Sequence, residues 1–166
     1  MEVRQMATAF LFNGKKVLMM KRSGSRLFSG EFWTGLGGHL EPEELNSPKE
    51  ACLREIYEES GIAAKDIAGL KLRYILLRNK EGEIRQQFVY FGRAAATEFI
   101  SSEEGELHWT DLREPQRLPM SAILRFMLEH YLRNLESEQI FVGTMTLSSD
   151  KQPQIQWTAL QDPIVF

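Results

Sequence analysis

One segment, residues 47–61, constrains the fold of this chain most, because both of its ends carry signals typical of helix ends. Ser47, Pro48 and Glu50 have the spacing of a capping box with proline at the first helical position, and Gly61 suits the residue that follows a helix. Segments typical of β-strands lie on both sides of it, at 5–12, 15–22, 70–78 and 84–95. A helix between strands predicts an α/β fold.

Turn signals divide the strand segments into hairpins. Asn13-Gly14 lies between the first two apolar runs, and the turn-like "NKEGE" joins the next two. The polar stretch 23–31 is predicted as a loop, and a further short strand is predicted at "LHWTD". Residues 139–166 are predicted to form another hairpin.

A second helix is predicted at residues 119–135, because apolar side chains recur there at i, i+3 and i+4 spacing. The apolar positions are Met120, Ile123, Leu124, Met127, Leu128, Tyr131, Leu132 and Leu135. This stripe is interpreted as a surface that faces the core. Strands on both sides of the first helix, followed by this second helix, predict an α/β sandwich.

Length and composition narrow the class of protein. The 166 residues suffice for about one domain with a hydrophobic core. A net charge of −3 argues against a long nucleic acid as the main partner, since phosphate-binding surfaces need clustered Lys and Arg. The single cysteine, Cys52, excludes an internal disulfide and a cysteine-based zinc site. Neither a signal peptide nor a membrane-spanning run is found, so a reducing, cytoplasmic setting is expected.

The first helix carries an unusual set of carboxylates. At about 100° per residue, Glu55, Glu58 and Glu59 share one face with Ala51 and Arg54. The opposite face, predicted to pack, holds Cys52, Leu53, Ile56, Tyr57 and Ser60. Glu55 and Glu59 repel each other at i,i+4, and Glu58 and Glu59 lie at the negative end of the helix dipole. The two interpretations are a solvated charged face and a site for a hard cation, Mg²⁺ or Mn²⁺.

The segment "GGHLEPEELNSPKEACLREIYEESGI", residues 37–62, resembles the signature of the Nudix hydrolases, G-x5-E-x7-R-E-U-x-E-E-x-G-U, where U is a bulky apolar residue. The fixed positions are occupied in order by Gly38, Glu44, Arg54, Glu55, Ile56, Glu58, Glu59, Gly61 and Ile62. Nine residues rather than seven separate Glu44 from Arg54, and the additional pair is identified as Leu45-Asn46. The acidic helix is therefore intact, and the longer loop affects the position of Glu44.

The resemblance covers approximately residues 5–135 in element order. It implies a Nudix-type α/β/α sandwich with a mixed β-sheet between helices, and a single domain in which residues 136–166 form a C-terminal β-hairpin extension. It also implies hydrolysis of a nucleoside diphosphate linked to another moiety. Its cofactor would be Mg²⁺, with Mn²⁺ as a substitute, held by Glu55, Glu58, Glu59 and the carbonyl group of Gly38.

The motif also places Arg54 among the catalytic residues. Cleavage of a phosphoanhydride needs a positioned water and neutralisation of charge on the phosphate oxygens, which a site of this composition can supply. Some family members take their general base from a later loop, where "SSEEGELHW" offers Glu104, with Glu103 and Glu106 as alternatives. These three acids are alternatively interpreted as solvated loop residues.

Substrate-binding candidates lie before the acidic helix. "FWTGLGGHLE" resembles the segment of MutT-type enzymes that remove oxidised purine nucleotides, although Thr34 replaces the asparagine that some of them have. Gly35, Gly37 and Gly38 suit a close approach of the backbone to a neighbouring group. The candidate binding residues are Arg22, Arg26, Trp33, Thr34, Gly37, Gly38 and His39. The aromatic residues weighed as either base-stacking or core side chains are Phe28, Phe32, Trp33 and Trp109.

Three hypotheses about function follow. The first is a Mg²⁺-dependent pyrophosphohydrolase that converts a nucleoside triphosphate, with oxidised purines such as 8-oxo-dGTP as candidates, into a nucleoside monophosphate and pyrophosphate. The second keeps the fold and changes the small-molecule substrate to ADP-ribose, a dinucleoside polyphosphate, a sugar nucleotide or an RNA cap. Residues 136–166 would then shape the pocket or form a homodimer surface. The third is a non-catalytic nucleotide-binding module.

Overall fold

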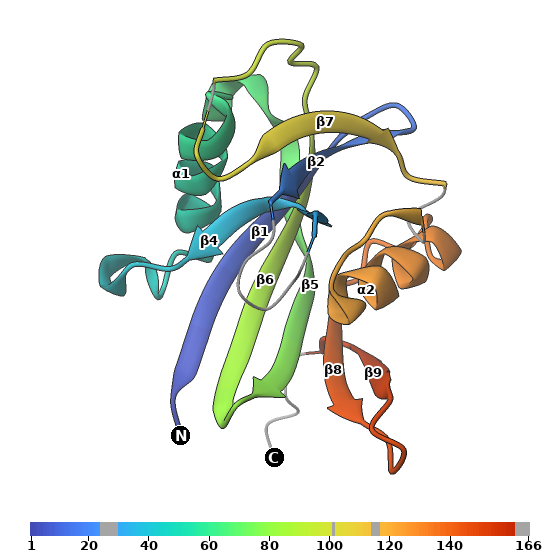
Figure 1. Ribbon diagram of the computed structural model, residues 1–166. Coiled ribbons are helices and arrows are strands. Elements are labelled where there is room, and N and C mark those ends of the chain that lie inside the picture. The colour runs from blue at the N-terminus through green and yellow to red at the C-terminus, as the bar shows by residue number, and fades with distance from the viewer. Residues whose placement is uncertain (24–29, 101, 114–116, 162–166) are drawn as a thin grey trace.

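The computed structural model describes residues 1–23, 30–100, 102–113 and 117–161 (Figure 1). The elements in chain order are β1 (Val3–Asn13), β2 (Lys16–Arg22), β3 (Phe32–Thr34), β4 (Leu36–His39), the 3₁₀ helix η1 (Pro42–Glu44), α1 (Pro48–Ser60), the 3₁₀ helix η2 (Ala64–Asp66), β5 (Ala68–Lys80), β6 (Glu83–Arg93), β7 (Glu106–Asp111), α2 (Ala122–Arg133), β8 (Phe141–Leu147) and β9 (Pro153–Ala159). Arg26 and Phe28, both named as candidates above, lie outside the described residues.

The described strands form one mixed sheet. Its main order is β3-β2-β1-β6-β5-β8-β9, while β4 pairs with β1 and β7 pairs with β2. β1 runs parallel to β6 and β5 runs parallel to β8, whereas the other pairs are antiparallel. α1 and α2 cover opposite faces of this sheet (Figure 1). The predicted α/β/α sandwich with a mixed sheet is therefore confirmed.

Side chains of strand β1 contribute to two hydrophobic cores, one on each face of the sheet. Ala7 and Leu11 pack with Ile56 of α1 on one face of the sheet. Phe10 points to the other face and packs with Met127 of α2. All of these side chains are fully buried. Because side chains alternate between the two faces of a strand, a nearly continuous apolar run is what a strand covered by helices on both sides requires.

The predicted hairpins are present. β1 and β2 are joined by a turn at Gly14 and Lys15, one residue later than the Asn-Gly signal suggested. β5 and β6 are joined by Glu81 and Gly82, both of which have positive φ angles, 58° and 80°. Two consecutive residues of positive φ are the geometry of a type I′ turn, whose twist matches that of the paired strands. The predicted short strand at "LHWTD" is β7.

Helix α2 confirms the predicted second helix with shorter ends. It begins after Ser121, whose extended backbone places it at the N-cap position. Its buried residues are Ile123, Leu124, Met127 and Leu128. The assignment of Leu135 to the packed stripe was wrong, since the helix has ended by that point and the Leu135 side chain is 55% exposed.

Helix α1 begins and ends where predicted, but the capping box at its start is absent. Ser47 makes no side-chain capping hydrogen bond. The two backbone N–H groups that a capping box would satisfy already donate to backbone carbonyls: Glu50 to the oxygen of Ser47 at 2.9 Å, and Ser47 to the oxygen of Glu44 at 2.8 Å. At the other end, Gly61 has φ 78° and its N–H donates to the carbonyl of Tyr57, as predicted for a glycine C-cap.

The predicted division of α1 into a packed face and an acidic face was partly wrong. Cys52 and Ile56 are buried as expected, but the Tyr57 side chain is 59% exposed, while Ala51 and Glu59 are buried. The reason is that α1 packs against strand β4 as well as the centre of the sheet. This second contact rotates the buried surface toward the acids. One of the motif carboxylates is therefore inside the protein.

Strands β3 and β4 lie within the glycine-rich segment that was not predicted to contain strands. Glycine weakens a strand in isolation, but here it permits a close approach. A Cβ atom on Gly37 would lie 2.1 Å from the carbonyl oxygen of Ala7 in β1, and Gly37 has φ 153°. The predicted close approach of this backbone to a neighbour is confirmed, and the neighbour is β1.

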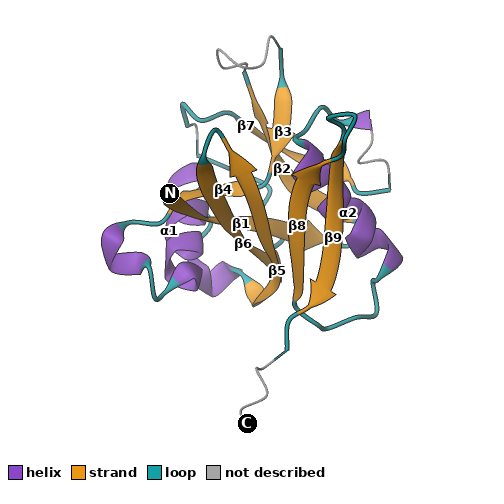
Figure 2. Ribbon diagram, turned by 90° about the horizontal axis from the view of Figure 1, so that it is seen from below, coloured by secondary structure: helices purple, strands orange, loops and turns teal. Residues whose placement is uncertain are grey.

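The C-terminal hairpin extends the sheet (Figure 2). β8 adds to β5 in parallel, and β9 forms the edge. The Trp157 ring covers Gly143, where a Cβ atom would lie 2.4 Å from it, and it packs on His130 of α2 with 4.4 Å between ring centroids. The predicted hairpin is confirmed. Within the described part of the chain, neither helix has the length and apolar composition needed to cross a membrane.

Candidate active site

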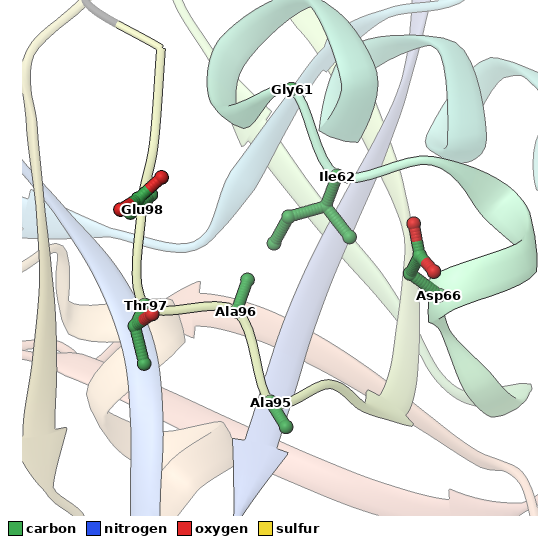
Figure 3. Close-up of a pocket in the computed structure, with 7 residues that line it drawn as sticks. All are labelled: Gly61, Ile62, Asp66, Ala95, Ala96, Thr97 and Glu98. Carbon is green, nitrogen blue, oxygen red and sulfur yellow. The ribbon is translucent and has the colours of Figure 1, made fainter.

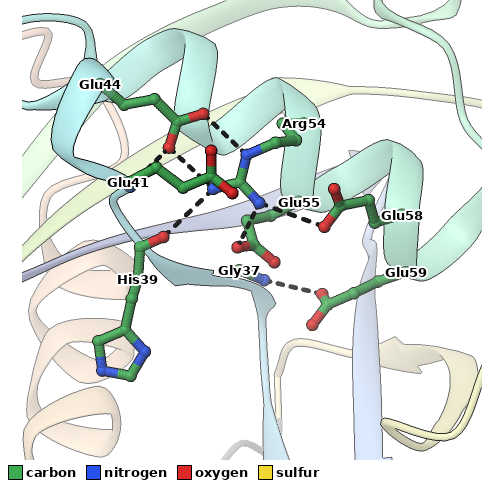
Figure 4. A network of polar contacts seen from close by, with 8 residues as sticks. All are labelled: Gly37, His39, Glu41, Glu44, Arg54, Glu55, Glu58 and Glu59. Carbon is green, nitrogen blue, oxygen red and sulfur yellow. Dashed lines mark hydrogen bonds and ion pairs between the residues drawn. The ribbon is translucent and has the colours of Figure 1, made fainter.

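Arg54 of α1 lies at the centre of a network of hydrogen bonds and ion pairs (Figure 4). Its Nε and Nη2 atoms donate to the two carboxylate oxygens of Glu44 at 2.7 and 2.8 Å. Its Nη1 atom donates to Glu55 at 2.9 Å and to Glu58 at 3.2 Å, and Nη2 also reaches the carbonyl oxygen of His39 at 3.2 Å. One guanidinium therefore relieves the repulsion among three motif carboxylates and ties α1 to the chain that follows β4.

The longer loop leaves Glu44 in the network. Leu45 and Asn46 form a turn between η1 and α1, and the Leu45 side chain is 53% exposed. Glu44 meets Arg54 through both oxygens and also accepts the backbone N–H of Glu41 at 2.9 Å. The hydrogen bond from Arg54 is the main reason that the pKa of Glu44 is lowered to about 2. The two inserted residues therefore form a surface turn and do not remove Glu44 from its contact with Arg54. Glu44 is ionised at neutral pH and is held in place by this contact.

Glu59 is the buried carboxylate of the motif, with 5% of its surface exposed. Its Oε2 atom accepts the backbone N–H of Gly37 at 2.8 Å. Burial, followed by the charges of Glu55 and Glu104, raises the pKa of Glu59 to about 7, although the hydrogen bond from Gly37 acts in the opposite direction. Burial likewise raises the pKa of Glu55. Burial thus disfavours the charged form of both carboxylates, although Glu55 forms an ion pair with Arg54.

Gly38 lies directly against Glu55. A Cβ atom on Gly38 would lie 2.5 Å from Oε1 of Glu55, closer than atoms of this kind approach. On β4 the next residue, His39, points the other way, and Figure 4 shows its ring directed away from the carboxylates. Burial first, and then the charges of Arg4 and Arg85, lower the pKa of His39. The β4 backbone therefore separates an acidic side from a basic side.

A cleft of about 570 Å³ opens beside these groups. Its lining residues are Met6, Arg22, Gly37, Gly38, His39, Leu40, Glu41, Pro42, Arg54, Glu55, Glu59 and Glu104. Arg22 and Glu104 form an ion pair there, and the Arg22 guanidinium lies 5.9 Å from the centroid of the Phe32 ring. The predicted candidates that meet in the cleft are thus Arg22, Gly37, Gly38, His39, Arg54, Glu55, Glu59 and Glu104.

Three predicted candidates lie elsewhere. Glu58 is tied to Arg54, but its side chain is 55% exposed and does not line the cleft. The Trp33 ring packs against the core below α2 and meets His108 edge-on at 5.5 Å. Thr34 belongs to β3, at one end of the strand order, and is paired with Met20 of β2. Trp109, weighed as a stacking residue, is a core side chain whose indole N–H donates to the carbonyl of Ala96 at 2.9 Å.

Four residues that line the cleft were not predicted as candidates, namely Met6, Leu40, Glu41 and Pro42. Met6 belongs to β1 and points to the face of the sheet that carries Phe10, a relation that the period-two pattern of the strand contains. Glu41 stands where β4 gives way to η1. Its position depends on how this connection turns, and no residue pattern signals that.

Another hollow of similar size, about 520 Å³, lies at the far end of α1 (Figure 3). It is lined by Gly61, Ile62, Asp66, Ala95, Ala96, Thr97 and Glu98. Its two acids, Asp66 and Glu98, are exposed and belong to separate segments. Because none of the described residues that line this hollow has a cationic side chain, the cleft beside Glu55 and Glu59 is the better candidate for chemistry on phosphates.

The donor set of the cleft suits a hard cation. Among the described residues, no three acidic, histidine or cysteine side chains are already gathered into a metal-binding group. Arg54 neutralises Glu55 and Glu58 instead. The available donors are carboxylate and carbonyl oxygens, which Mg²⁺ prefers, and the raised pKa values of Glu55 and Glu59 show that these carboxylates would gain from a cation. The residues present therefore fit a divalent metal ion.

The sequence profile described as NUDIX domain matches residues 3–131. The chain belongs to the Nudix family. It is accordingly an enzyme, a Nudix pyrophosphohydrolase, and the expected family assignment is confirmed. The matched residues include α1 and most of α2, whereas the β8–β9 hairpin lies outside the match.

Solved structures of Nudix proteins have the same fold. The mutator MutT protein of Bacillus halodurans superposes with a TM-score of 0.67 at 24% identity, over 96% of this chain and 99% of that one. A MutT protein of Methanosarcina mazei gives a TM-score of 0.64 at 26% identity, over 82% and 97% of the two chains. A MutT Nudix hydrolase of Burkholderia pseudomallei gives 0.63 at 25% identity, over 78% and 98%. Their common core is the helix-covered mixed sheet.

Proposed function

We propose that this Nudix enzyme hydrolyses a phosphoanhydride bond of a nucleotide in a Mg²⁺-dependent reaction. The observation that carries the proposal is the pair of buried or nearly buried carboxylates, Glu55 and Glu59, which face a cleft together with Arg22 and Glu104. Burying carboxylates costs stability unless a cation joins them. A metal ion with a polyphosphate would complete the charge balance of this cleft.

Glu55, Glu58 and Glu59, together with the carbonyl oxygen of Gly38, are the proposed metal ligands. The bound ion would neutralise charge that develops on the phosphate oxygens and lower the pKa of a bound water. Nη1 of Arg54 donates to both Glu55 and Glu58. One or both of these hydrogen bonds would have to break for the two carboxylates to bind the ion. Arg54 keeps its two hydrogen bonds to Glu44 and thereby remains attached beside the ligands.

The remaining groups of the cleft act on the substrate and on the water. Glu104 is the proposed general base, because its carboxylate lines the cleft and can accept the proton of the attacking water. Arg22, which is paired with Glu104, is placed to bind phosphate oxygens. The backbone of Gly37, Gly38 and His39 forms the wall against which the phosphates would lie.

A nucleoside triphosphate is the first candidate substrate, with an oxidised purine nucleotide such as 8-oxo-dGTP as the specific case. Its support is the likeness of "FWTGLGGHLE" to the corresponding segment of MutT-type enzymes. The products would be a nucleoside monophosphate and pyrophosphate. The second candidate is another nucleoside diphosphate derivative. Thr34 favours it, because the asparagine of some MutT-type enzymes is missing at this position.

Hydrolysis of a nucleotide panel in the presence of Mg²⁺, with products identified by mass, tests the proposal. The panel should contain dGTP, 8-oxo-dGTP, ADP-ribose, a dinucleoside polyphosphate and a sugar nucleotide. Turnover that EDTA abolishes, with products cut at an anhydride bond, supports the proposal. Turnover that persists in EDTA contradicts it. The preferred nucleotide decides between the two candidate substrates.

A further inference from the structure

Three arginines occupy adjacent positions on neighbouring strands of the sheet. Arg4 of β1 is in register with Arg85 of β6, and Arg85 is in register with Arg78 of β5. Residues in register point to the same face of a sheet. Phe10 and Phe91, in register six residues farther along the first pair of strands, both belong to the core below α2. Arg4, Arg78 and Arg85, here named the arginine row, therefore lie on the α2 side.

The positive charge of the arginine row is only partly neutralised. Glu83 forms ion pairs with Arg4 and with Arg85, each at 2.8 Å. Arg78 has no hydrogen bond or ion pair within the described part of the chain, and its neighbour on β8 is Met145. Burial, followed by the charge of Arg85, lowers the pKa of Arg78. Like charges opposite each other destabilise a sheet, so a half-buried, unpaired Arg78 is a feature that packing does not explain.

The arginine row begins beside the catalytic cleft. Met6, which lines the cleft, lies two residues from Arg4 on the same face of β1, about 7 Å along the strand. β6 and β5 place Arg85 and Arg78 about 5 and 10 Å farther across the sheet. The ends of β1, β5 and β6 that carry the row lie together at the end of the sheet where the N-terminus is found (Figure 1). Arg4, the first member of the row, is therefore the arginine of the row that is nearest along β1 to the lining of the cleft.

We propose that the arginine row binds an anionic group of the substrate that is separate from the anhydride bond to be hydrolysed. The group would be a phosphate, since guanidinium groups match its oxygens with paired hydrogen bonds. This inference rests on the proposed function. It assigns the substrate to nucleoside diphosphate derivatives that carry a further phosphate on the ribose or on the second moiety. It therefore favours the second candidate substrate.

Two pairs of nucleotides that differ by one ribose phosphate provide the test: NAD and NADP, and dephospho-coenzyme A and coenzyme A. Affinities are measured by calorimetry in EDTA, so that no metal-dependent turnover interferes. The wild-type protein should bind the phosphorylated member of at least one pair about tenfold more tightly, the effect of a charge-assisted hydrogen bond. Equal affinities within both pairs would overturn the inference.

Substitutions test whether the arginine row causes the preference for the phosphorylated nucleotide. Arg78→Met removes the unpaired charge and should reduce the tenfold preference to twofold or less, while Arg78→Lys keeps the charge but loses the paired hydrogen bonds and should retain only part of the preference. Lys71→Gln removes one charge from an exposed position near the other end of β5 and should leave the preference unchanged. A preference that survives Arg78→Met in a protein with an unaltered unfolding temperature would also overturn the inference.

Hydrolysis is measured separately with Mg²⁺. Hydrolysis of the panel without any phosphate preference leaves the proposed function intact and removes the role of the arginine row. A phosphate preference without hydrolysis confirms the row as an anion site and contradicts the proposed function. The two proposals can therefore fail independently.

Discussion

Gly38 and Glu55 are in such close contact that the smallest possible side chain on Gly38 would lie 2.5 Å from the carboxylate of Glu55. The contact joins β4 to α1 at the point where the proposed metal ligands meet. It explains why a glycine is needed at this position of the motif. The need is for space, since no positive φ angle is recorded there.

Gly38→Ala should therefore displace Glu55 and impair catalysis more than folding. We expect a loss of about 100-fold in kcat, because catalytic groups tolerate displacements of only a fraction of an ångström. Steady-state kinetics and thermal unfolding check this result. Gly82→Ala is the matched control. No described atom lies within 4 Å of the added methyl group, and the φ of 80° at this position strains an alanine, so the variant should lose stability at the β5–β6 turn and keep wild-type kcat. Wild-type kcat in Gly38→Ala would contradict the assigned contact.

Glu59→Gln should stabilise the metal-free protein at alkaline pH. The pKa of Glu59 in the folded protein is raised to about 7, so wild-type stability falls as pH rises from the ordinary value of 4.5 to 7 and stays reduced above it. The glutamine has no such penalty and can still accept the N–H of Gly37. We expect an advantage of about 3 kcal/mol at pH 8 that disappears near pH 4.5.

Denaturant unfolding in EDTA at several pH values measures this difference. Glu58→Gln is the control, since it makes the same chemical change at a side chain that is 55% exposed and should not reproduce the gain in stability at pH 8. Equal stability of wild type and Glu59→Gln at pH 8 would show that Glu59 carries no burial penalty.

Glu44→Gln should have the opposite pH dependence. The pKa of Glu44 is lowered to about 2 by Arg54, so its contribution to stability is complete above pH 4.5 and is lost as the pH falls toward 2. The variant should be less stable than wild type by about 1–2 kcal/mol at pH 7, after allowance for solvent screening, and the gap should close between pH 4.5 and 2. Urea unfolding across this range provides the measurement, and a gap independent of pH would contradict the prediction.

Glu43→Gln is a suitable control for Glu44→Gln. Glu43 is exposed and precedes Glu44 in the same 3₁₀ helix. Its substitution should change stability at pH 7 much less than Glu44→Gln does, because the described contacts of Arg54 do not include Glu43.

The parts of the fold that the sequence predicted are those governed by local rules. Gly14, Gly61 and Gly82 mark turns or a helix end through backbone conformations that glycine adopts most easily. The apolar period of α2 likewise reports its buried face. The β3 and β4 strands could not be predicted, because Gly37 is in a strand only on account of its fit against Ala7, a contact distant in sequence.

The candidate site divides in the same way. The spacing of Glu55, Glu58 and Glu59 put them on one helix face, but their different environments depend on packing: Glu59 is buried, while Glu58 is exposed. The helix period alone does not predict which of the three acids is buried. The contact of α1 with β4 determines that it is Glu59. The proposed role of Arg78 could not be predicted from the neighbouring sequence either, because it depends on the strand register that places Arg78 beside Arg85.

The most direct test of the central claim is nucleotide hydrolysis by wild type and Glu59→Gln with Mg²⁺, with products identified by mass. Glu106→Gln, which changes a 74% exposed acid outside the cleft, is the control. The wild type and the control should cleave the preferred nucleotide at an anhydride bond, and Glu59→Gln should lose turnover by about 1,000-fold or more while remaining folded. Near-normal turnover in Glu59→Gln would contradict the account.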